Sequence, residues 1–267
     1  MGHKIILILV VLLVLLPTVG FSTADPAMQG LKEKAAAGDR AAQEVLGWMY
    51  YGGMGVDQDY GQATQWYRLA AKQGSAEGQF FLGALLVQGK AGPEGAAEAA
   101  RWWRQAARQG LPAAQYHLGV LYARGEGVEA DISQAFVLIQ EAAEAEYSQG
   151  EYALGLLYYL GRGVTQNDEK AFQWFQKAAE RGVSDAQYYV GKMYAHGQGV
   201  PQDRTKALFW LNKAVAQGDS LAILSRSRMR REIGPEKFTL LEQRARRLQP
   251  SPVDGLNDEA EKGDGEW

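Results

Sequence analysis

The chain has 267 residues, of which 46% are apolar and 22% are charged, proportions typical of a folded globular protein. Its formal charge of −3 argues against a generally basic nucleic-acid binder. The absence of cysteine excludes disulfides, thiolate metal sites and a cysteine nucleophile. Glycine accounts for 32 residues, well above its usual share of ~7%, and this excess requires an explanation.

Residues 1–24 are predicted to be a signal peptide that directs export. A lysine and the α-amino group supply a positive start, and the apolar run 5–16 follows. Ser22 and Ala24 place small residues at the −3 and −1 positions of a cleavage site. A membrane-spanning helix needs ~20 apolar residues, so an uncleaved membrane anchor is the weaker alternative. We therefore expect a mature chain that begins near Asp25 and works in the periplasm or outside the cell.

The glycine excess follows a repeat of 36 residues. Five such units, about residues 38–217, predict a tandem array, and residues 25–37 are expected to form a lead-in helix. Glu146 stands where the series of glycines is interrupted. Three kinds of residue mark the period. They are the glycines Gly38, Gly74, Gly110, Gly182 and Gly218; the Leu-Gly or Val-Gly pairs that start at Leu46, Leu82, Leu118, Leu154 and Val190; and the tryptophans Trp66, Trp102, Trp174 and Trp210.

Each unit is expected to contain two helices. In the first unit, apolar residues lie on one helical face, a glycine-rich turn follows, and Asp59 can cap a second helix that Gly74 ends in a left-handed conformation. Neither helix can bury its apolar face alone, so the units are predicted to stack. The side chains expected to fill the space between the helices are Leu46, Tyr50 and Trp66.

This unit resembles the Sel1-like repeat family, which is related to the tetratricopeptide repeats. The first unit carries the family signature as Ala42, Leu46, Gly47, Tyr50, Gly53, Gly55, Val56, Asp59, Ala63, Trp66, Ala70 and Ala71. In the second unit, Leu86 replaces the tyrosine and residues 89–93 replace the turn, so the conformation of that loop is left open. The resemblance implies an all-α fold, a right-handed α-solenoid of five helix-turn-helix repeats, and a role as an adaptor or scaffold.

The two ends of the predicted array differ in charge. Residues 218–249 are predicted to form a C-terminal helical cap, in which eight basic residues outnumber the acidic ones. A solvated cap is the simpler interpretation, and a site for an acidic partner or an anionic surface is the alternative. Residues 250–267 contain six acidic residues and a single aromatic one, which is typical of a disordered acidic tail.

Motifs for catalysis are absent from the sequence. It contains no S-x-x-K, G-x-S-x-G or phosphate-loop pattern. His117 and His196 are the only histidines after residue 24, which excludes an H-E-x-x-H zinc site. Some cysteine-rich relatives in the family are described as hydrolysing β-lactams, but this chain lacks their cysteine pairs and an activated serine. We therefore expect no enzymatic activity, no cofactor and no metal.

Residues that vary between the repeats point to a binding surface. Positions 45 and 48 and their equivalents lie on one face of each first helix, beside the packing face. First helices line the concave surface of such solenoids, so we expect a groove with aromatic and basic anchors that contribute little to folding. Ordinary packing between repeats is the alternative. The candidate partner-binding residues are Val45, Trp48, Phe81, His117, Arg124, Tyr189, Lys192 and His196.

The sequence is therefore interpreted as a non-catalytic exported scaffold that binds a protein or peptide through its concave surface. Binding of cell-wall glycans, through sugars stacked on exposed aromatic rings, is a second hypothesis. Hydrolysis of β-lactams is a third and weaker one. We expect no nucleic-acid partner, and contact with a membrane only if the signal segment is uncleaved.

Overall fold

The computed structural model describes residues 26–89 and 95–248, and within these ranges all regular secondary structure is α-helical. This confirms the predicted all-α class. None of the helices in the described ranges is both long and apolar enough to cross a membrane. The predicted signal peptide, the predicted acidic tail and most of the irregular loop 89–93 lie outside the described residues.

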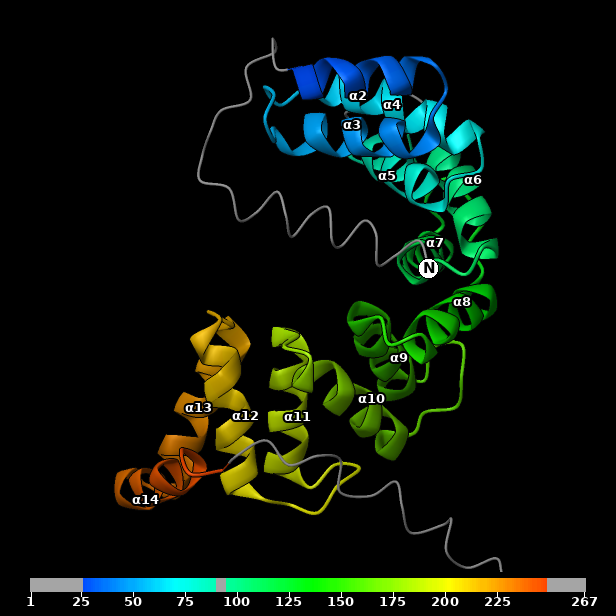
Figure 1. The fold of residues 1–267 in the computed structure, drawn as a ribbon. Coiled ribbons are helices and arrows are strands. Elements are labelled where there is room, and N and C mark those ends of the chain that lie inside the picture. Colours follow the sequence, from blue (N-terminus) through cyan, green and yellow to red (C-terminus); the bar gives the residue numbers. More distant parts are fainter. Residues whose placement is uncertain (1–25, 90–94, 249–267) are drawn as a thin grey trace, which may run out of the picture. The chain divides into compact units, whose positions relative to one another are not determined.

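The chain divides into two compact units, residues 1–135 and 136–267, here called unit 1 and unit 2 (Figure 1). Within each unit, neighbouring helices in the chain pack against each other. Unit 1 contains α2 (Pro26–Ala36), α3 (Arg40–Gly52), α4 (Tyr60–Lys72), α5 (Ala76–Val87), α6 (Gly95–Arg108) and α7 (Pro112–Arg124). The boundary falls within α8 (Ile132–Glu144). Unit 2 continues with α9 (Ser148–Leu160), α10 (Asp168–Glu180), α11 (Ser184–His196), α12 (Arg204–Ala216), α13 (Ser220–Ile233) and α14 (Pro235–Ala245).

The helix ends follow the predicted signals. Asp59 Oδ1 accepts a hydrogen bond of 2.9 Å from the backbone N–H of Gln62 and so caps α4. The predicted left-handed glycine, Gly74, has a φ angle of 84°, and the equivalent glycines also have positive φ angles, namely 97° at Gly38, 80° at Gly110, 92° at Gly182 and 85° at Gly218. Glu146 occupies the same place with φ 61°, the only non-glycine residue with positive φ in the described ranges. This conformation costs a residue with a β-carbon about 1–2 kcal/mol, so Glu146 is strained.

In the first, second, fourth and fifth repeats, the core is built around a glycine in the first helix. A β-carbon added to Gly155 would lie 2.6 Å from the ring of Phe175, and one added to Gly83 would lie 2.4 Å from the ring of Trp103. No side chain tolerates contacts this short. The glycine in the repeated Leu-Gly pair is therefore required because the second helix places a large side chain directly against the backbone of the first.

The ring that fills this space is one residue later than predicted. Three of the repeated tryptophans, Trp66, Trp102 and Trp174, are only half-buried, whereas Trp210 is buried as expected. Successive residues of a helix point about 100° apart, so the residue after the tryptophan faces the glycine and the tryptophan lies beside the contact. The residues that face the glycine are Tyr67 (1% exposed), Trp103 (3%), Phe175 (0%) and Leu211 (1%).

Helices α13 and α14 pack against α12 where the sequence predicts a cap. Met229 and Phe238 join the core of unit 2. The guanidinium of Arg226 pairs with Glu242 and lies 5.4 Å from the centroid of the Phe238 ring. This segment is not uniformly polar, because three large apolar side chains of α13 are exposed, namely Leu221, Ile223 and Leu224.

Candidate functional site

The predicted binding residues at the two ends of unit 1 include both surface and packing residues. Val45 on α3 is exposed, as is Arg124 at the end of α7, whose guanidinium forms a 3.7 Å salt bridge with Glu126. Trp48, in contrast, is half-buried and packs against two clusters of core side chains, one in α2 and α3 and one in α4 to α6. Trp48 therefore contributes to packing, contrary to the expectation that the candidate residues add little to folding.

Phe81, His117 and Tyr189 share one repeat position and lie against the buried ring of the preceding repeat. The ring of Phe81 stacks on Tyr67 with centroids 5.1 Å apart. The ring of His117 lies 5.1 Å from that of Trp103, and burial lowers the pKa of His117. These side chains join neighbouring repeats, as the alternative interpretation of packing between repeats predicts.

In unit 2, the candidate residues belong to a cluster of tyrosines on α9 and α11. Tyr189 stacks on Phe175 at 4.7 Å and lies edge-on to Tyr159 at 5.5 Å. Lys192 Nζ donates a hydrogen bond of 3.1 Å to Tyr159 Oη. Burial lowers the pKa of Lys192, but this hydrogen bond and the neighbouring tyrosines raise the pKa overall. His196 is exposed at the end of α11. We call Tyr152, Tyr159, Tyr188, Tyr189 and Lys192 the tyrosine face; all five side chains are half-buried.

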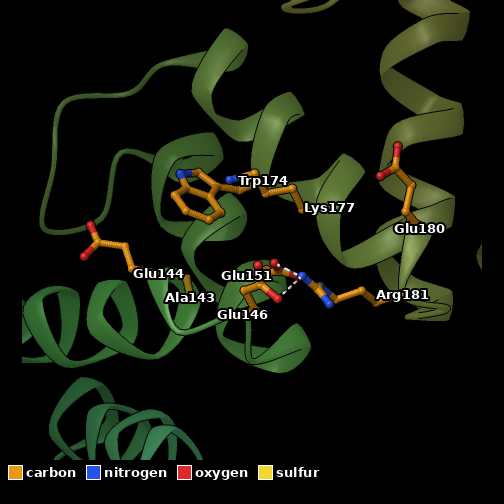
Figure 2. Close-up of a pocket in the computed structure, with 8 residues that line it drawn as sticks. All are labelled: Ala143, Glu144, Glu146, Glu151, Trp174, Lys177, Glu180 and Arg181. Atoms are coloured by element: carbon orange, nitrogen blue, oxygen red, sulfur yellow. Dashed lines mark hydrogen bonds and ion pairs between the residues drawn. The ribbon is translucent and has the colours of Figure 1, made fainter. Parts of the chain in front are cut away.

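A cavity of about 550 Å³ in unit 2 was not predicted from the sequence (Figure 2). It lies where the end of α8 and the following turn meet α9 and α10, and it is within the ~300–1,000 Å³ range of small-ligand sites. Figure 2 shows the indole of Trp174 on one side and the carboxylates of Glu146 and Glu151 on the other. The lining residues are Ala143, Glu144, Glu146, Glu151, Trp174, Lys177, Glu180 and Arg181.

Arg181 joins two carboxylates at the base of this cavity. Its Nη2 lies 2.9 Å from Glu146 Oε2, and its Nε donates a hydrogen bond of 3.2 Å to Glu151 Oε1. Glu151 is only 1% exposed, and its Oε2 accepts no hydrogen bond, although Arg181 Nε lies 3.2 Å away. Burial raises the pKa of Glu151, and the charge and hydrogen bond of Arg181 only partly oppose this effect.

The other charged groups of the cavity come from α8 and α10. Lys177 Nζ lies 4.2 Å from the centroid of the Trp174 ring. Glu144 and Glu180 accept hydrogen bonds from Gln140 and Gln176, and neither forms an ion pair with a described residue. Across the described ranges, no group of three or more histidine or acidic side chains could hold a metal ion.

The sequence contained three signals for this cavity. Glu146 interrupts the series of repeated glycines, and a glutamate at a position that favours glycine indicates a local requirement. The other signals are Glu151, which replaces a glutamine present in the other four repeats, and Arg181, which replaces a glutamine present in three of them. These departures from the repeat become informative once the structure brings the three side chains together.

Comparison with known proteins confirms the resemblance predicted from the repeat. The Sel1 repeat family matches residues 40–75, 76–111, 112–147, 148–183 and 184–219. The fold is similar to that of a protective antigen present in uropathogenic Escherichia coli strains, which displays an SLR fold. The two share 32% identity and a TM-score of 0.73 over 82% of this chain and 48% of the antigen.

A Sel1 repeat protein from Oxalobacter formigenes is also similar, with 31% identity and a TM-score of 0.71 over 85% of this chain and 92% of that protein. The present chain spans about half the length of the Escherichia coli antigen. No curated protein matches the sequence.

Proposed function

Because the chain belongs to the Sel1 repeat family, we propose that it is a non-catalytic scaffold that is exported and binds a protein or peptide partner. Proteins built from these repeats are generally interaction scaffolds rather than enzymes. In this proposal the partner contacts first-helix side chains, which the sequence assigns to a concave surface. The tyrosine face supplies the contacts in unit 2, and Val45, Trp48, Phe81, His117 and Arg124 supply those in unit 1.

The proposal rests on one observation, which is that the side chains of the tyrosine face are held in fixed positions by contacts with each other and with the core. The rings of Tyr159 and Tyr189 pack against each other and against Phe175, and Lys192 is hydrogen-bonded to one of them. Tyrosine is enriched among the residues that dominate binding energy at interfaces. Side chains that are already fixed lose little conformational entropy when a partner binds. A half-buried, fixed set of tyrosines therefore favours an interaction surface over a simple solvated face.

The proposal is tested by using the purified protein to capture partners from cell-envelope extracts. Tyr188 is the best residue to replace, because it lies edge-on to Tyr189 at 5.2 Å and is half-buried rather than part of the core. We expect Tyr188→Ala to reduce recovery of the partner about tenfold, as for loss of a binding hot spot. Because Tyr188 packs only at the edge of the core, the melting temperature should fall less than it does on removal of the fully buried ring of Phe175.

The matched control is Leu69→Ala, which removes an exposed apolar side chain in unit 1. Equal recovery with wild-type protein and Tyr188→Ala contradicts binding at the tyrosine face. Recovery of cell-wall glycan in place of a protein contradicts the choice of partner.

Export is part of the proposal and is supported by the sequence of residues 1–24. A short positive start, an apolar run and small residues before Asp25 are the features of a cleavable signal. Mass measurement of the natively expressed protein is expected to show loss of residues 1–24. A chain that retains Met1 and sediments with membranes would support an anchor instead.

A further inference from the structure

Three departures from the repeat converge on the cavity of unit 2. The five repeats form an internal alignment, in which Glu146 occupies a glycine position and Glu151 and Arg181 occupy glutamine positions. The corresponding residues elsewhere are Gly38, Gly74, Gly110, Gly182 and Gly218; Gln43, Gln79, Gln115 and Gln187; and Gln73, Gln109 and Gln217. Arg181 contacts both glutamates, at 2.9 Å and 3.2 Å, so the three substitutions form one group of side chains.

The fold does not require these charges. In the first, second and fifth repeats, a neutral amide pair links the same two positions. Gln73 donates to Gln43 at 2.8 Å, Gln109 to Gln79 at 2.9 Å and Gln217 to Gln187 at 2.9 Å. The charged version in the fourth repeat adds a buried carboxylate and a strained backbone at Glu146. Packing alone therefore gives no reason for the substitutions.

The balance of charge in the cavity indicates the class of ligand. Four glutamates line the cavity, against one lysine and one arginine. Arg181 is already paired with two carboxylates, so it is not available to bind an anion. Glu151 is buried and already paired with Arg181, whereas Glu144 and Glu180 lack a cationic partner among the described residues. The site therefore favours a ligand that brings positive charge and hydrogen-bond donors.

The wall opposite these carboxylates suits the same ligand. The indole of Trp174 faces the cavity (Figure 2), and Lys177 Nζ lies 4.2 Å from its ring centroid, so this ring already interacts with a cation. We propose that the cavity binds a guanidinium or alkylammonium group, supplied by an arginine or lysine side chain of the protein partner. This inference rests on the proposed scaffold function and specifies the chemistry of the partner.

The inference is tested by titrating the full chain with the blocked tripeptide acetyl-Gly-Arg-Gly-amide and following the indole NMR signal of Trp174. The matched ligand is the same peptide with citrulline, which keeps the shape of arginine but has no charge. We expect the arginine peptide to bind about tenfold more tightly than the citrulline peptide, because a charged donor binds a carboxylate more strongly than a neutral one does. Equal affinity for the two peptides overturns the proposal.

Two protein variants separate the site from a general effect of charge. Glu146→Gln keeps the size of the side chain, and we expect it to weaken binding of the arginine peptide by about tenfold. Glu169→Gln makes the same change of charge at an exposed position of α10 that does not line the cavity, and it should leave binding unchanged. Equal loss in both variants overturns the proposal.

The source of the cation is tested with spermidine, a free alkylammonium compound. If spermidine binds more weakly than the arginine peptide, the result supports a protein partner as the source of the cation. If spermidine binds more tightly, the result contradicts a protein source. The cavity proposal and the scaffold proposal can fail separately. If the arginine peptide does not bind but Tyr188→Ala still reduces partner capture, the cavity proposal fails and the scaffold proposal stands.

Discussion

Units 1 and 2 each contain a glutamate paired with an arginine, and the two pairs differ in their surroundings. In unit 1, Glu98 Oε1 on α6 accepts hydrogen bonds of 3.0 Å from both Arg68 Nη1 and Trp102 Nε1. Burial raises the pKa of Glu98, but these two donors and the charge of Arg68 lower it overall. In unit 2, Glu151 shares Arg181 with Glu146, and its pKa is raised.

From this difference we expect the two ion pairs to have opposite effects on stability at pH 7. Glu98 links two second helices, and the surrounding donors favour its charged form. Glu151 is more deeply buried, has fewer donors, and adjoins a strained residue. A buried carboxylate and a left-handed glutamate that depart from the repeat are better explained by binding than by packing. The proposals for unit 2 depend on this contrast.

The largest expected effect is a loss of stability in unit 2, and it should be greater for a core residue than for a residue that lines the cavity. Phe175 is fully buried against Gly155, so Phe175→Ala should reduce the free energy of unfolding by about 3–5 kcal/mol. Trp174 is half-buried, so Trp174→Ala should cause less than half of that loss. Urea unfolding measures both. A greater loss in Trp174→Ala would place that ring in the core and contradict the description of the cavity.

The second prediction compares the change in stability when Glu98 or Glu151 is replaced by glutamine. Glu98→Gln should reduce stability by about 1.5–3 kcal/mol, because charge-assisted hydrogen bonds are lost. Glu151→Gln restores the residue of the other four repeats and leaves Arg181 paired with Glu146. We expect it to leave stability unchanged or to increase it. Urea denaturation of both variants at pH 7 measures these changes in stability. Equal destabilisation by the two substitutions would contradict the proposed difference between the units.

The smallest effect is a difference in pH dependence. The folded-state pKa of Glu98 is lowered, so its contribution to stability is present above its usual pKa of 4.5 and is lost as the pH falls through the folded value. The folded-state pKa of Glu151 is raised, so its contribution is present below 4.5 and is lost as the pH rises through the folded value.

Urea unfolding of wild-type, Glu98→Gln and Glu151→Gln proteins between pH 7 and pH 4 measures this difference. The destabilisation caused by Glu98→Gln and any stabilisation caused by Glu151→Gln should both diminish as the pH falls. A stabilisation by Glu151→Gln that grows on acidification would contradict the raised pKa of Glu151.

Much of the fold could be predicted because the repeat is a periodic signal. The all-α class, the left-handed glycines and the aspartate caps follow from local patterns at positions such as Gly74 and Asp59. The identity of the buried ring could not be predicted. Trp174 and Phe175 are both large and adjacent, and only the angle at which α10 meets Gly155 determines which of them faces the core.

The candidate site was less predictable than the fold. Phe81 and Tyr189 lie at positions that vary between the repeats, but the sequence does not reveal that each ring stacks on a buried ring of the preceding repeat. The cavity was missed because its residues are separated by up to 38 positions in the sequence, from Ala143 to Arg181. Glu146, Glu151 and Arg181 depart from the repeat, but only the structure shows that they lie together and that Glu146 has a positive φ angle.

The most direct test of the account restores the repeat pattern at the cavity by combining Glu146→Gly, Glu151→Gln and Arg181→Gln. Stability and binding of acetyl-Gly-Arg-Gly-amide are then measured on the same protein. The account predicts a stability gain of about 1 kcal/mol, because the left-handed strain and the buried charge are removed. It also predicts at least about tenfold weaker binding of the peptide. A variant that is less stable than the wild type and binds the peptide equally well would show that these residues serve the fold, and would contradict the account.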